Sequence, residues 1–214
     1  MFKGFISDMD GVIADTEEFH WLGKKAFLKT LGFNLTLDDY KKFIGNSATE
    51  NIEVYRNDYK IMLSDEAIVS RYNRLVLDAI PAKIKTKKAY KQLLLILQKN
   101  GLKLALVSNS SKGIIAKILK GTGLDVYFPI INSSEDFGTK TAAYRNAVIK
   151  MKLKPEDCFV LEDSAKGVRD AKNAGLYCVA IPNKSYVSGL SAADEVFVSL
   201  TEFLNKGKAL EGMK

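Results

Sequence analysis

The sequence predicts an α/β fold, a Rossmann-like parallel sheet that carries an inserted all-helical domain of four helices. Two observations lead to this prediction. Short apolar and β-branched runs alternate with longer helical patterns over most of the 214 residues, as in βαβ units whose helices cover both faces of a parallel sheet. Residues 16–80 break the alternation, because one helical pattern follows another there without a strand pattern of comparable strength.

Six short segments carry the strand pattern, and each is rich in apolar or β-branched residues. They are Lys3–Asp8, Leu102–Ser108, Pro129–Asn132, Cys158–Leu161, Tyr177–Ile181 and Glu195–Val198. The helical patterns between them are Thr86–Asn100, Lys112–Thr122, Thr139–Met151, Ala165–Ala174 and Thr201–Lys206. In "NGLKLALVSNS" and "AGLYCVAIP", a glycine that ends a helix is followed at once by a strand.

The helical block lies between the first strand and the point near residue 82 where the sheet resumes. Its helical patterns are Glu17–Leu31, Leu37–Phe43, Thr49–Tyr59 and Asp65–Ala79. Such a block is typical of a separate cap domain over residues 16–81, inserted into a discontinuous Rossmann-like core of residues 1–15 and 82–214. The two crossings, near Asp15–Thr16 and Pro81–Ala82, would then form a pair of hinges.

The composition is that of a globular protein, with 47% hydrophobic and 27% charged residues. No apolar stretch approaches the roughly 18 residues that span a bilayer, and the N-terminus lacks a signal-peptide pattern. We therefore expect a cytoplasmic protein without membrane contact, and a monomer or weak dimer. The formal charge of +7 comes from scattered lysines, which favours an anionic small substrate over nucleic acid. Cys158 and Cys178 lie in strand-like segments and are expected to be buried, reduced thiols.

Polar side chains cluster where the predicted strands end. Asp8 and Asp10 follow the first strand, Ser108, Asn109 and Ser110 follow the second, and Glu162 and Asp163 follow the "CFV" strand. Lys140 opens the helix after "NSSEDFGT". Because ligands of parallel α/β sheets bind at the carboxyl ends of the strands, a shared site is the economical explanation.

The acidic residues of this site predict a magnesium ion. Asp8, Asp10, Glu162 and Asp163 would place four carboxylates in one crevice, and magnesium takes a few carboxylates together with waters and a substrate phosphate. An EF-hand calcium loop does not fit, because its required glycine and glutamate positions hold Ile13 and Phe19.

The donors of the site predict phosphoryl transfer. The Ser108 hydroxyl and the Asn109 backbone N–H could each donate to a phosphate oxygen, and Lys140 adds a positive charge. With Asp8 as a carboxylate nucleophile, these groups make a phosphoaspartyl transfer site. Asp10 would protonate the leaving oxygen and later activate water, and Gly11 would permit the tight turn next to it.

Four motifs resemble those of the haloacid dehalogenase superfamily of phosphatases and phosphomutases. They are "DMDGV", "VSNSS", Lys140 and "LEDSAKGVRDAKNAG", and they occur in the family's order over residues 8–175. The helical block is similar to that family's four-helix cap. In one respect the chain departs from the family, because relatives commonly read Lys-Pro-x-Pro where this sequence has "KTAAY" at 140–144.

The resemblance implies a role for each motif residue. Asp8 would be the nucleophile, Asp10 the general acid and base, and Ser108 and Lys140 the phosphate-stabilising groups. Asp8, the Asp10 backbone carbonyl and Asp163 would bind magnesium. Glu162 would either bind the metal directly or support the groups that do. Family members that dehalogenate lack the second aspartate, so Asp10 disfavours dehalogenase activity.

The cap sequence bears on whether water or a sugar hydroxyl accepts the phosphoryl group. The opening of the chain, including Thr16 and His20, closely resembles β-phosphoglucomutases, although phosphoglycolate-type and sugar-phosphate phosphatases share it. We expect Gly45, Asn46 and Ser47 of the cap loop, together with His20, to contact substrate. Mutases of this type carry an arginine just after the Gly-x-Ser of that loop, and this chain has none there.

Arg71, on the fourth cap helix, could supply a cation in place of the missing arginine. The alternative interpretation is that Arg71 lies on a solvated face of its helix. The missing arginine favours a phosphatase that acts on a small phosphorylated metabolite held between core and cap, such as a sugar phosphate or a phosphoglycolate-like compound. The alternative is a β-phosphoglucomutase-type phosphomutase.

Overall fold

A six-stranded parallel sheet forms the centre of the molecule in the computed structural model, which describes residues 1–183 and 189–211. The strands run in the order β3-β2-β1-β4-β5-β6. They are β1 (Gly4–Ser7), β2 (Lys103–Val107), β3 (Ile130–Asn132), β4 (Cys158–Glu162), β5 (Tyr177–Ala180) and β6 (Glu195–Val196). All five strand pairs are parallel. The predicted fold class and the six predicted strands are confirmed.

The sheet has helices on both faces because the alternate side chains of each central strand are apolar. Phe5 of β1 points into one core cluster and Ile6 into the other. The Phe5 cluster includes residues of α5 (Tyr90–Lys99), α6 (Lys112–Thr122) and α9 (Leu200–Lys206). The Ile6 cluster includes residues of α7 (Lys140–Met151) and α8 (Ala165–Asn173). A strand that is buried on both faces is typical of a parallel sheet.

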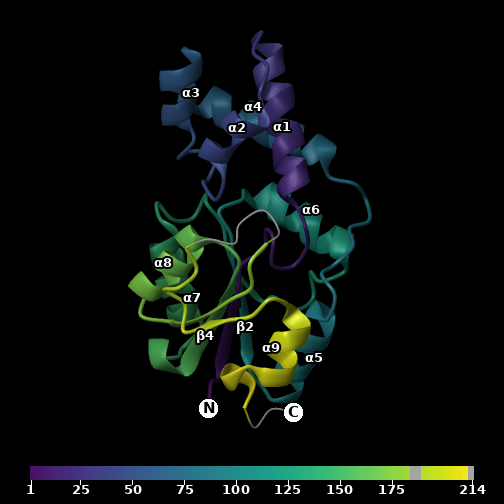
Figure 1. Ribbon diagram of the computed structural model, residues 1–214, viewed down its shortest axis with the longest axis vertical. Coiled ribbons are helices and arrows are strands. Elements are labelled where there is room, and N and C mark those ends of the chain that lie inside the picture. The colour runs from purple at the N-terminus through teal and green to yellow at the C-terminus, as the bar shows by residue number, and fades with distance from the viewer. Residues whose placement is uncertain (184–188, 212–214) are drawn as a thin grey trace.

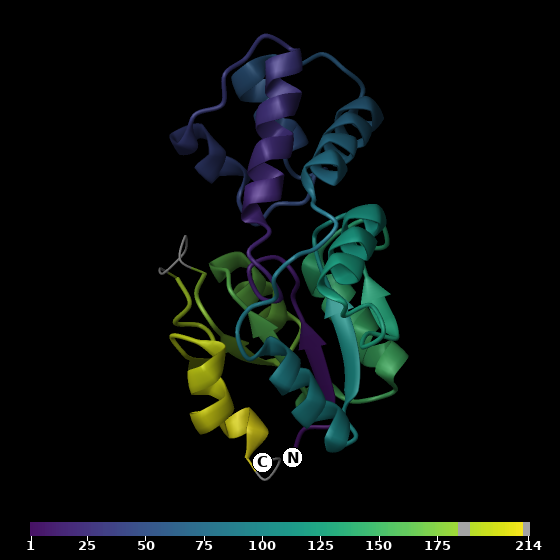
Figure 2. The ribbon, with the colours of Figure 1, turned by 90° about the vertical axis from the view of Figure 1, so that its right-hand side faces the viewer.

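The helical insertion, which we call the cap, sits at one end of the sheet (Figure 1). It contains α1 (Glu17–Thr30), α2 (Leu37–Tyr40), a 3₁₀ turn (Lys41–Phe43), α3 (Ile52–Tyr59) and α4 (Asp65–Ala79). A separate apolar cluster with Phe27, Tyr55 and Ile68 forms its core. At Gly23 the two long helices α1 and α4 are so close that a Cβ would lie 2.4 Å from Val76 Cγ2. Figure 2 shows the two chain segments that join the cap to the sheet.

Two predicted helices begin later than expected by more than one residue. The helix predicted from Thr86 begins at Tyr90, because Lys87 N–H donates to the Ile13 carbonyl at 2.8 Å and Ala89 has a φ of 70°. The helix predicted from Thr49 begins at Ile52. There Ser47 N–H donates to Glu50 Oε2 at 2.7 Å, and Glu50 N–H donates to Ser47 Oγ at 3.2 Å, which closes a turn before the helix. In both places a contact outside the helix decides its first residue.

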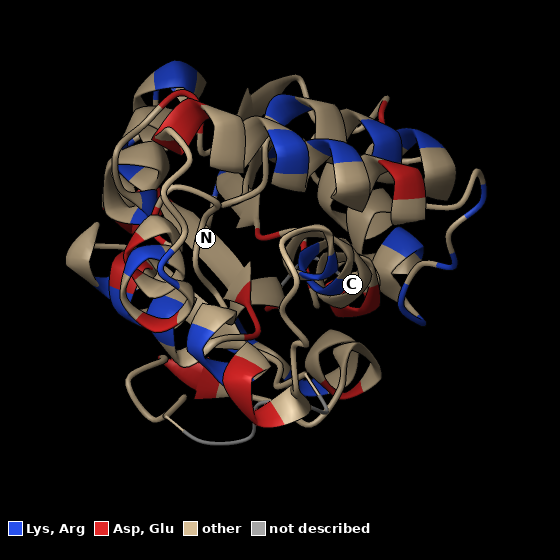
Figure 3. Ribbon diagram, turned by 90° about the horizontal axis from the view of Figure 1, so that it is seen from above, with Lys and Arg blue, Asp and Glu red and all other residues tan. Residues whose placement is uncertain are grey.

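Several other predictions concern the whole molecule. Both cysteines are free and buried, as predicted. Within residues 1–183 and 189–211, no helix is both long and apolar enough to cross a membrane. Seen from above, basic and acidic residues are interspersed over the helices (Figure 3). The domain boundaries at 15/16 and 81/82, the cytoplasmic location, the monomer or weak dimer and the absence of nucleic acid as a partner stay predictions.

Candidate active site

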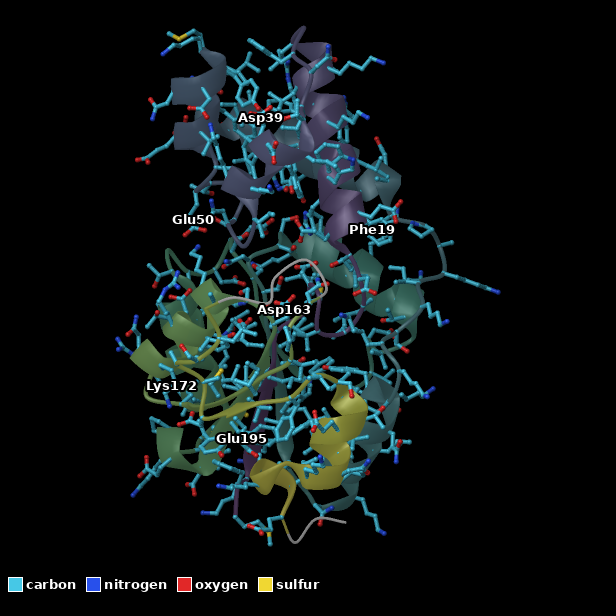
Figure 4. The ribbon with its side chains drawn as sticks, viewed as in Figure 1. Phe19, Asp39, Glu50, Asp163, Lys172 and Glu195 are labelled. Atoms are coloured by element: carbon cyan, nitrogen blue, oxygen red, sulfur yellow. The ribbon has the colours of Figure 1, made fainter. Side chains whose placement is uncertain are left out.

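The predicted site residues meet where the carboxyl ends of the central strands face the cap. Asp8 and Asp10 follow β1, Ser108 follows β2, Glu162 ends β4, and Lys140 is the first residue of α7. A cleft there has an empty volume of about 750 Å³, including the solvent at its mouth. Side chains from both sides line it, and those used below are Asp8, Asp10, Glu17, His20, Lys24, Phe43, Gly45, Asn46, Tyr72, Asn109, Ser110, Lys140 and Asp163. Figure 4 shows Asp163 at the upper end of the sheet and Glu50 at the facing edge of the cap.

Lys140 bridges two buried carboxylates at the floor of the cleft. Its Nζ lies 2.6 Å from Asp8 Oδ1 and 2.5 Å from Glu162 Oε1. The Tyr144 hydroxyl donates to the same Glu162 oxygen at 2.6 Å. Burial acts to lower the pKa of Lys140, but the charges of Asp8 and Glu162 outweigh it and raise the pKa. Lys140 is therefore held as a cation, in spite of the missing prolines in its motif.

The three carboxylates around Lys140 fit a hard divalent cation. Oxygens of Asp8, Glu162 and Asp163 lie within 4.8 Å of one another. Burial is the largest cause of the raised pKa of Asp8, with smaller contributions from neighbouring carboxylates, and Lys140 only partly opposes it. Burial and the charge of Glu162 raise the pKa of Asp163 to about 8. One lysine thus leaves an excess of negative charge, and a magnesium ion with oxygen ligands would neutralise it.

Glu162 is already surrounded by donors. Its Oε1 accepts from Lys140 and Tyr144, and its Oε2 accepts from the Asp163 backbone N–H at 3.1 Å. Gly167 makes room for it, since a Cβ there would lie 2.0 Å from Glu162 Oε1. The direct metal-ligand role of Glu162 stays a prediction, because a metal would have to displace one of these hydrogen bonds.

Asp10 is held by donors from two segments, the start of the cap near Thr16 and the loop after β2 about 100 residues away. Thr16 Oγ1 donates to its Oδ1 at 2.5 Å, and the hydroxyls of Ser108 and Ser110 donate to its Oδ2 at 3.1 and 3.0 Å. His20 Nε2 lies 3.3 Å from Oδ1. Burial acts to raise the pKa of Asp10, but His20 and the hydroxyl donors outweigh it and lower the pKa to about 2. Without substrate, Asp10 is therefore a carboxylate.

In the sequence, Ser110 is marked only as a polar residue after a strand, and nothing there marks Tyr72 as part of the site. Ser110 binds Asp10 and lies 3.4 Å from His20 Nε2. The Tyr72 hydroxyl lies 2.7 Å from His20 Nδ1 and accepts a hydrogen bond from Lys24 Nζ at 3.1 Å. Since Lys24 is a donor only, the tyrosine proton is free to go to Nδ1, which leaves the hydrogen of His20 on Nε2, facing Asp10.

The predicted cap residues divide into two groups. Gly45, Asn46 and His20 line the cleft, whereas Ser47 is buried and lines a smaller depression beside it. Arg71 is exposed and does not line the cleft. The Asn109 side chain donates to the Gly45 carbonyl at 3.0 Å, and Lys166 Nζ lies 2.6 Å from Glu50 Oε1. These two contacts join the cap to the core at the cleft.

Replacing Gly11 by alanine is expected to lower phosphate release by about 10- to 100-fold, an effect typical of displaced groups next to a metal site. Gly11 has a φ of 79°, and a Cβ there would lie 1.8 Å from Asp163 Oδ2. Gly123→Ala is the matched control, because Gly123 has a φ of 68° and a Cβ there would meet nothing within 4 Å. Steady-state assays at several magnesium concentrations measure the effect. Equal losses in the two variants would mean that backbone strain alone, and not Asp163, is responsible.

Comparison with known proteins places these residues in a family context. A family model described as "Haloacid dehalogenase-like hydrolase" matches residues 5–181. The phosphorylated carbohydrates phosphatase of Thermotoga maritima is 24% identical and covers 81% of this chain and 82% of its own. The β-phosphoglucomutase of Bacillus subtilis is 26% identical, and the match covers 84% of this chain and 83% of the mutase. Among solved structures, CbbY from Rhodobacter sphaeroides in complex with phosphate has a TM-score of 0.88 at 22% identity. The match covers 95% of this chain and 96% of CbbY.

Proposed function

The chain belongs to the haloacid dehalogenase-like hydrolases, and on that premise we propose a magnesium-dependent phosphatase that acts through a phosphoaspartyl intermediate on Asp8. Its substrate would be a small phosphorylated metabolite, such as a sugar phosphate or a phosphoglycolate-like compound. One observation carries the proposal. A buried carboxylate next to a buried lysine, Asp8 beside Lys140, faces the same cleft as a second carboxylate, Asp10, which is held by hydroxyl donors.

The two carboxylates would divide the reaction between them. In the first step, an oxygen of Asp8 forms a bond to phosphorus while the bond from phosphorus to the leaving oxygen breaks, and Asp10 gives that oxygen a proton. In the second step, water attacks the phosphorus, Asp10 takes a proton from the water, and the bond to Asp8 breaks to release phosphate. Ser108 and Lys140 would donate to the phosphoryl oxygens in both steps.

Asp8, Asp163 and the Asp10 carbonyl would hold magnesium, and Glu162 would either bind it directly or support these ligands. The metal would neutralise charge on the phosphoryl oxygens. In the substrate-free protein Asp10 is a carboxylate, which is the form that can accept a proton from water in the second step. For the first step Asp10 must be protonated. A bound phosphate would favour this, because it brings negative charge close to Asp10 and competes for the Ser108 and Ser110 hydroxyls.

The cap would bind the rest of the substrate and limit the access of water. Gly45 and Asn46 line the cleft opposite Asp8, and the contacts Asn109–Gly45 and Lys166–Glu50 keep that loop against the core. A cap that closes over bound substrate and opens for release is a common way to control phosphoryl transfer. We propose residues 16–81 as this unit, with crossings at 15/16 and 81/82.

A phosphomutase is the second candidate, and the 26% identity to the β-phosphoglucomutase of Bacillus subtilis favours it. A mutase must bind two phosphates and protect its phosphoenzyme from water. The cap loop "FIGNSATEN" has no arginine to bind a second phosphate in the bidentate manner. Sequence similarity to the phosphorylated carbohydrates phosphatase of Thermotoga maritima supports the hydrolase.

Phosphate release from p-nitrophenyl phosphate and from a panel of phosphorylated sugars, glycolate, glycerol and nucleotides tests the proposed function. We expect release that requires magnesium and stops when a chelator removes it. β-Glucose 1-phosphate separates the two candidates, because a mutase converts it to glucose 6-phosphate without net phosphate release. Such a conversion would overturn the hydrolase, and no turnover of any compound with magnesium present would overturn both candidates.

A further inference from the structure

Lys24 is a buried lysine in the cap that the proposed reaction does not use. It lies on α1, four residues after His20, and this spacing puts the two side chains on the same face of the helix. Only 3% of its surface is exposed, and it lines the cleft whose floor holds Asp8. Lysine side chains normally extend to put the ammonium group in water. This one is directed into the cleft instead.

The surroundings of Lys24 do not neutralise its charge. Among the described residues, no carboxylate lies within ion-pair distance of its Nζ, and its hydrogen bond goes to the Tyr72 hydroxyl at 3.1 Å. The rings of Tyr72, Phe43 and Tyr40 lie 4.5, 5.5 and 5.6 Å from Nζ. Burial lowers the pKa of Lys24 to about 8, against the weaker opposing influence of Glu17 and Asp10. A buried cation without an ion-pair partner is costly.

Most other charged groups that line the cleft already have partners, and Asp163 belongs to the carboxylate cluster around Lys140. Lys140 is paired with Asp8 and Glu162, and Asp10 with its hydroxyl donors. The nearby Glu17 carboxylate accepts a hydrogen bond from the Tyr40 hydroxyl. Lys24 is thus the one lysine or arginine among the described lining residues that has no carboxylate partner.

We infer that Lys24 binds a second anionic group of the substrate, a carboxylate or a second phosphate, at the cap end of the cleft, away from the phosphoryl group that is transferred. This inference rests on the proposed phosphatase function and narrows its substrate class to phosphate esters that carry another negative charge. The ammonium group and the rings around it form a compact site for one anionic oxygen, with Tyr72 as a neighbouring hydroxyl. A bound anion would give the buried cation the partner that the protein does not supply.

Paired substrates that differ in one anionic group test the inference. 2-Phosphoglycolate is compared with ethyl phosphate, and glucose 1,6-bisphosphate with glucose 6-phosphate. In Lys24→Met we expect kcat/KM for the member of a pair that carries the second anionic group to fall by about 10- to 100-fold, as for the loss of a charge-assisted hydrogen bond. For the member without that group, kcat/KM should change by less than about threefold. The pair that responds also tells whether the group is a carboxylate or a phosphate.

Two further variants separate charge from structure. Lys25→Met is the matched control, since Lys25 is the next residue and is exposed, and it should change neither member of a pair. Lys24→Gln keeps a hydrogen-bond donor for Tyr72 without the charge, and it should reproduce the selective loss. Thermal unfolding checks the fold, and we expect Lys24→Met to unfold at or above the wild-type midpoint because it removes a buried charge.

Three results would overturn the inference. If Lys24→Met lowers kcat/KM equally for both members of each pair, Lys24 positions His20 and Asp10 through Tyr72. Unchanged kcat/KM values in Lys24→Met would mean that Lys24 has a packing role alone. A preference of the wild-type protein for the members without a second anionic group would exclude a site for a second anion. If wild-type protein releases phosphate from none of the four compounds and from no other ester, the proposed phosphatase itself fails. A selective loss in Lys24→Met and Lys24→Gln supports the inference.

Discussion

Asp8→Asn is expected to lower kcat by roughly 10⁴-fold or more, because it removes the nucleophile on which both steps depend. The amide is nearly the same size, so the neighbouring side chains need not move. Lys140 keeps Glu162 as a partner at 2.5 Å, and we therefore expect the variant to fold. The measurement is magnesium-dependent phosphate release, together with trapping of the phosphorylated protein by rapid quenching.

Asp15→Asn is the matched control for this variant. Asp15 belongs to the same segment, but its side chain is 73% exposed and pairs with Lys87. It should keep nearly all activity, because an exposed ion pair contributes little. If Asp8→Asn retains more than a tenth of wild-type kcat, or still forms the phosphorylated protein, Asp8 is not the nucleophile.

Lys140→Met is expected to destabilise the metal-free protein by about 3–5 kcal/mol, the usual effect of removing one partner from a buried ion pair. Asp8 and Glu162 would then face each other and Asp163 without a cation. Magnesium should restore part of this loss of stability, because it neutralises the same carboxylates. Activity should still fall by about 10²- to 10³-fold with magnesium present, since a donor to the phosphoryl oxygens is gone.

Denaturant unfolding with and without magnesium measures the stability of Lys140→Met, and phosphate release measures its activity. Lys112→Met is the matched control, since Lys112 also begins a helix but pairs with Asp136 at the exposed surface. It should lose no more than about 1 kcal/mol. A Lys140→Met protein as stable as wild type in chelator would contradict the role of Lys140 as the counterion of this cluster.

Much of the fold and the position of the site could be predicted because the signals are local. The alternation of strand and helical patterns specified a parallel sheet with a helical insertion, and the helices Lys112–Thr122 and Asp65–Ala79 have the predicted bounds. Acids and hydroxyls after β1, β2 and β4 predicted a common site, since parallel strands present their carboxyl ends at the same edge. The residues concerned lie beside these strand ends in the structure.

Contacts between distant segments could not be predicted in this way. The late start of α5 depends on the hydrogen bond from Lys87 to Ile13, more than 70 residues away in the chain. The Tyr144 hydroxyl that reaches Glu162 lies in the part of the motif where the chain departs from its relatives. Neither has a sequence pattern of its own, because each depends on where another element passes.

By itself, the sequence determined the fold class, the order of the elements and the carboxylates that follow the strands, because periodicity and chain connectivity specify them. Only the tertiary structure decided which donors hold Asp10 and which lysine lacks a partner. Lys24 is one of 32 lysines and arginines, and nothing beside it in the sequence marks it. It is buried among rings from other parts of the cap, those of Tyr72, Phe43 and Tyr40. Charge and hydrogen bonding depend on distances through space, and these exist only once the cap has folded against the core.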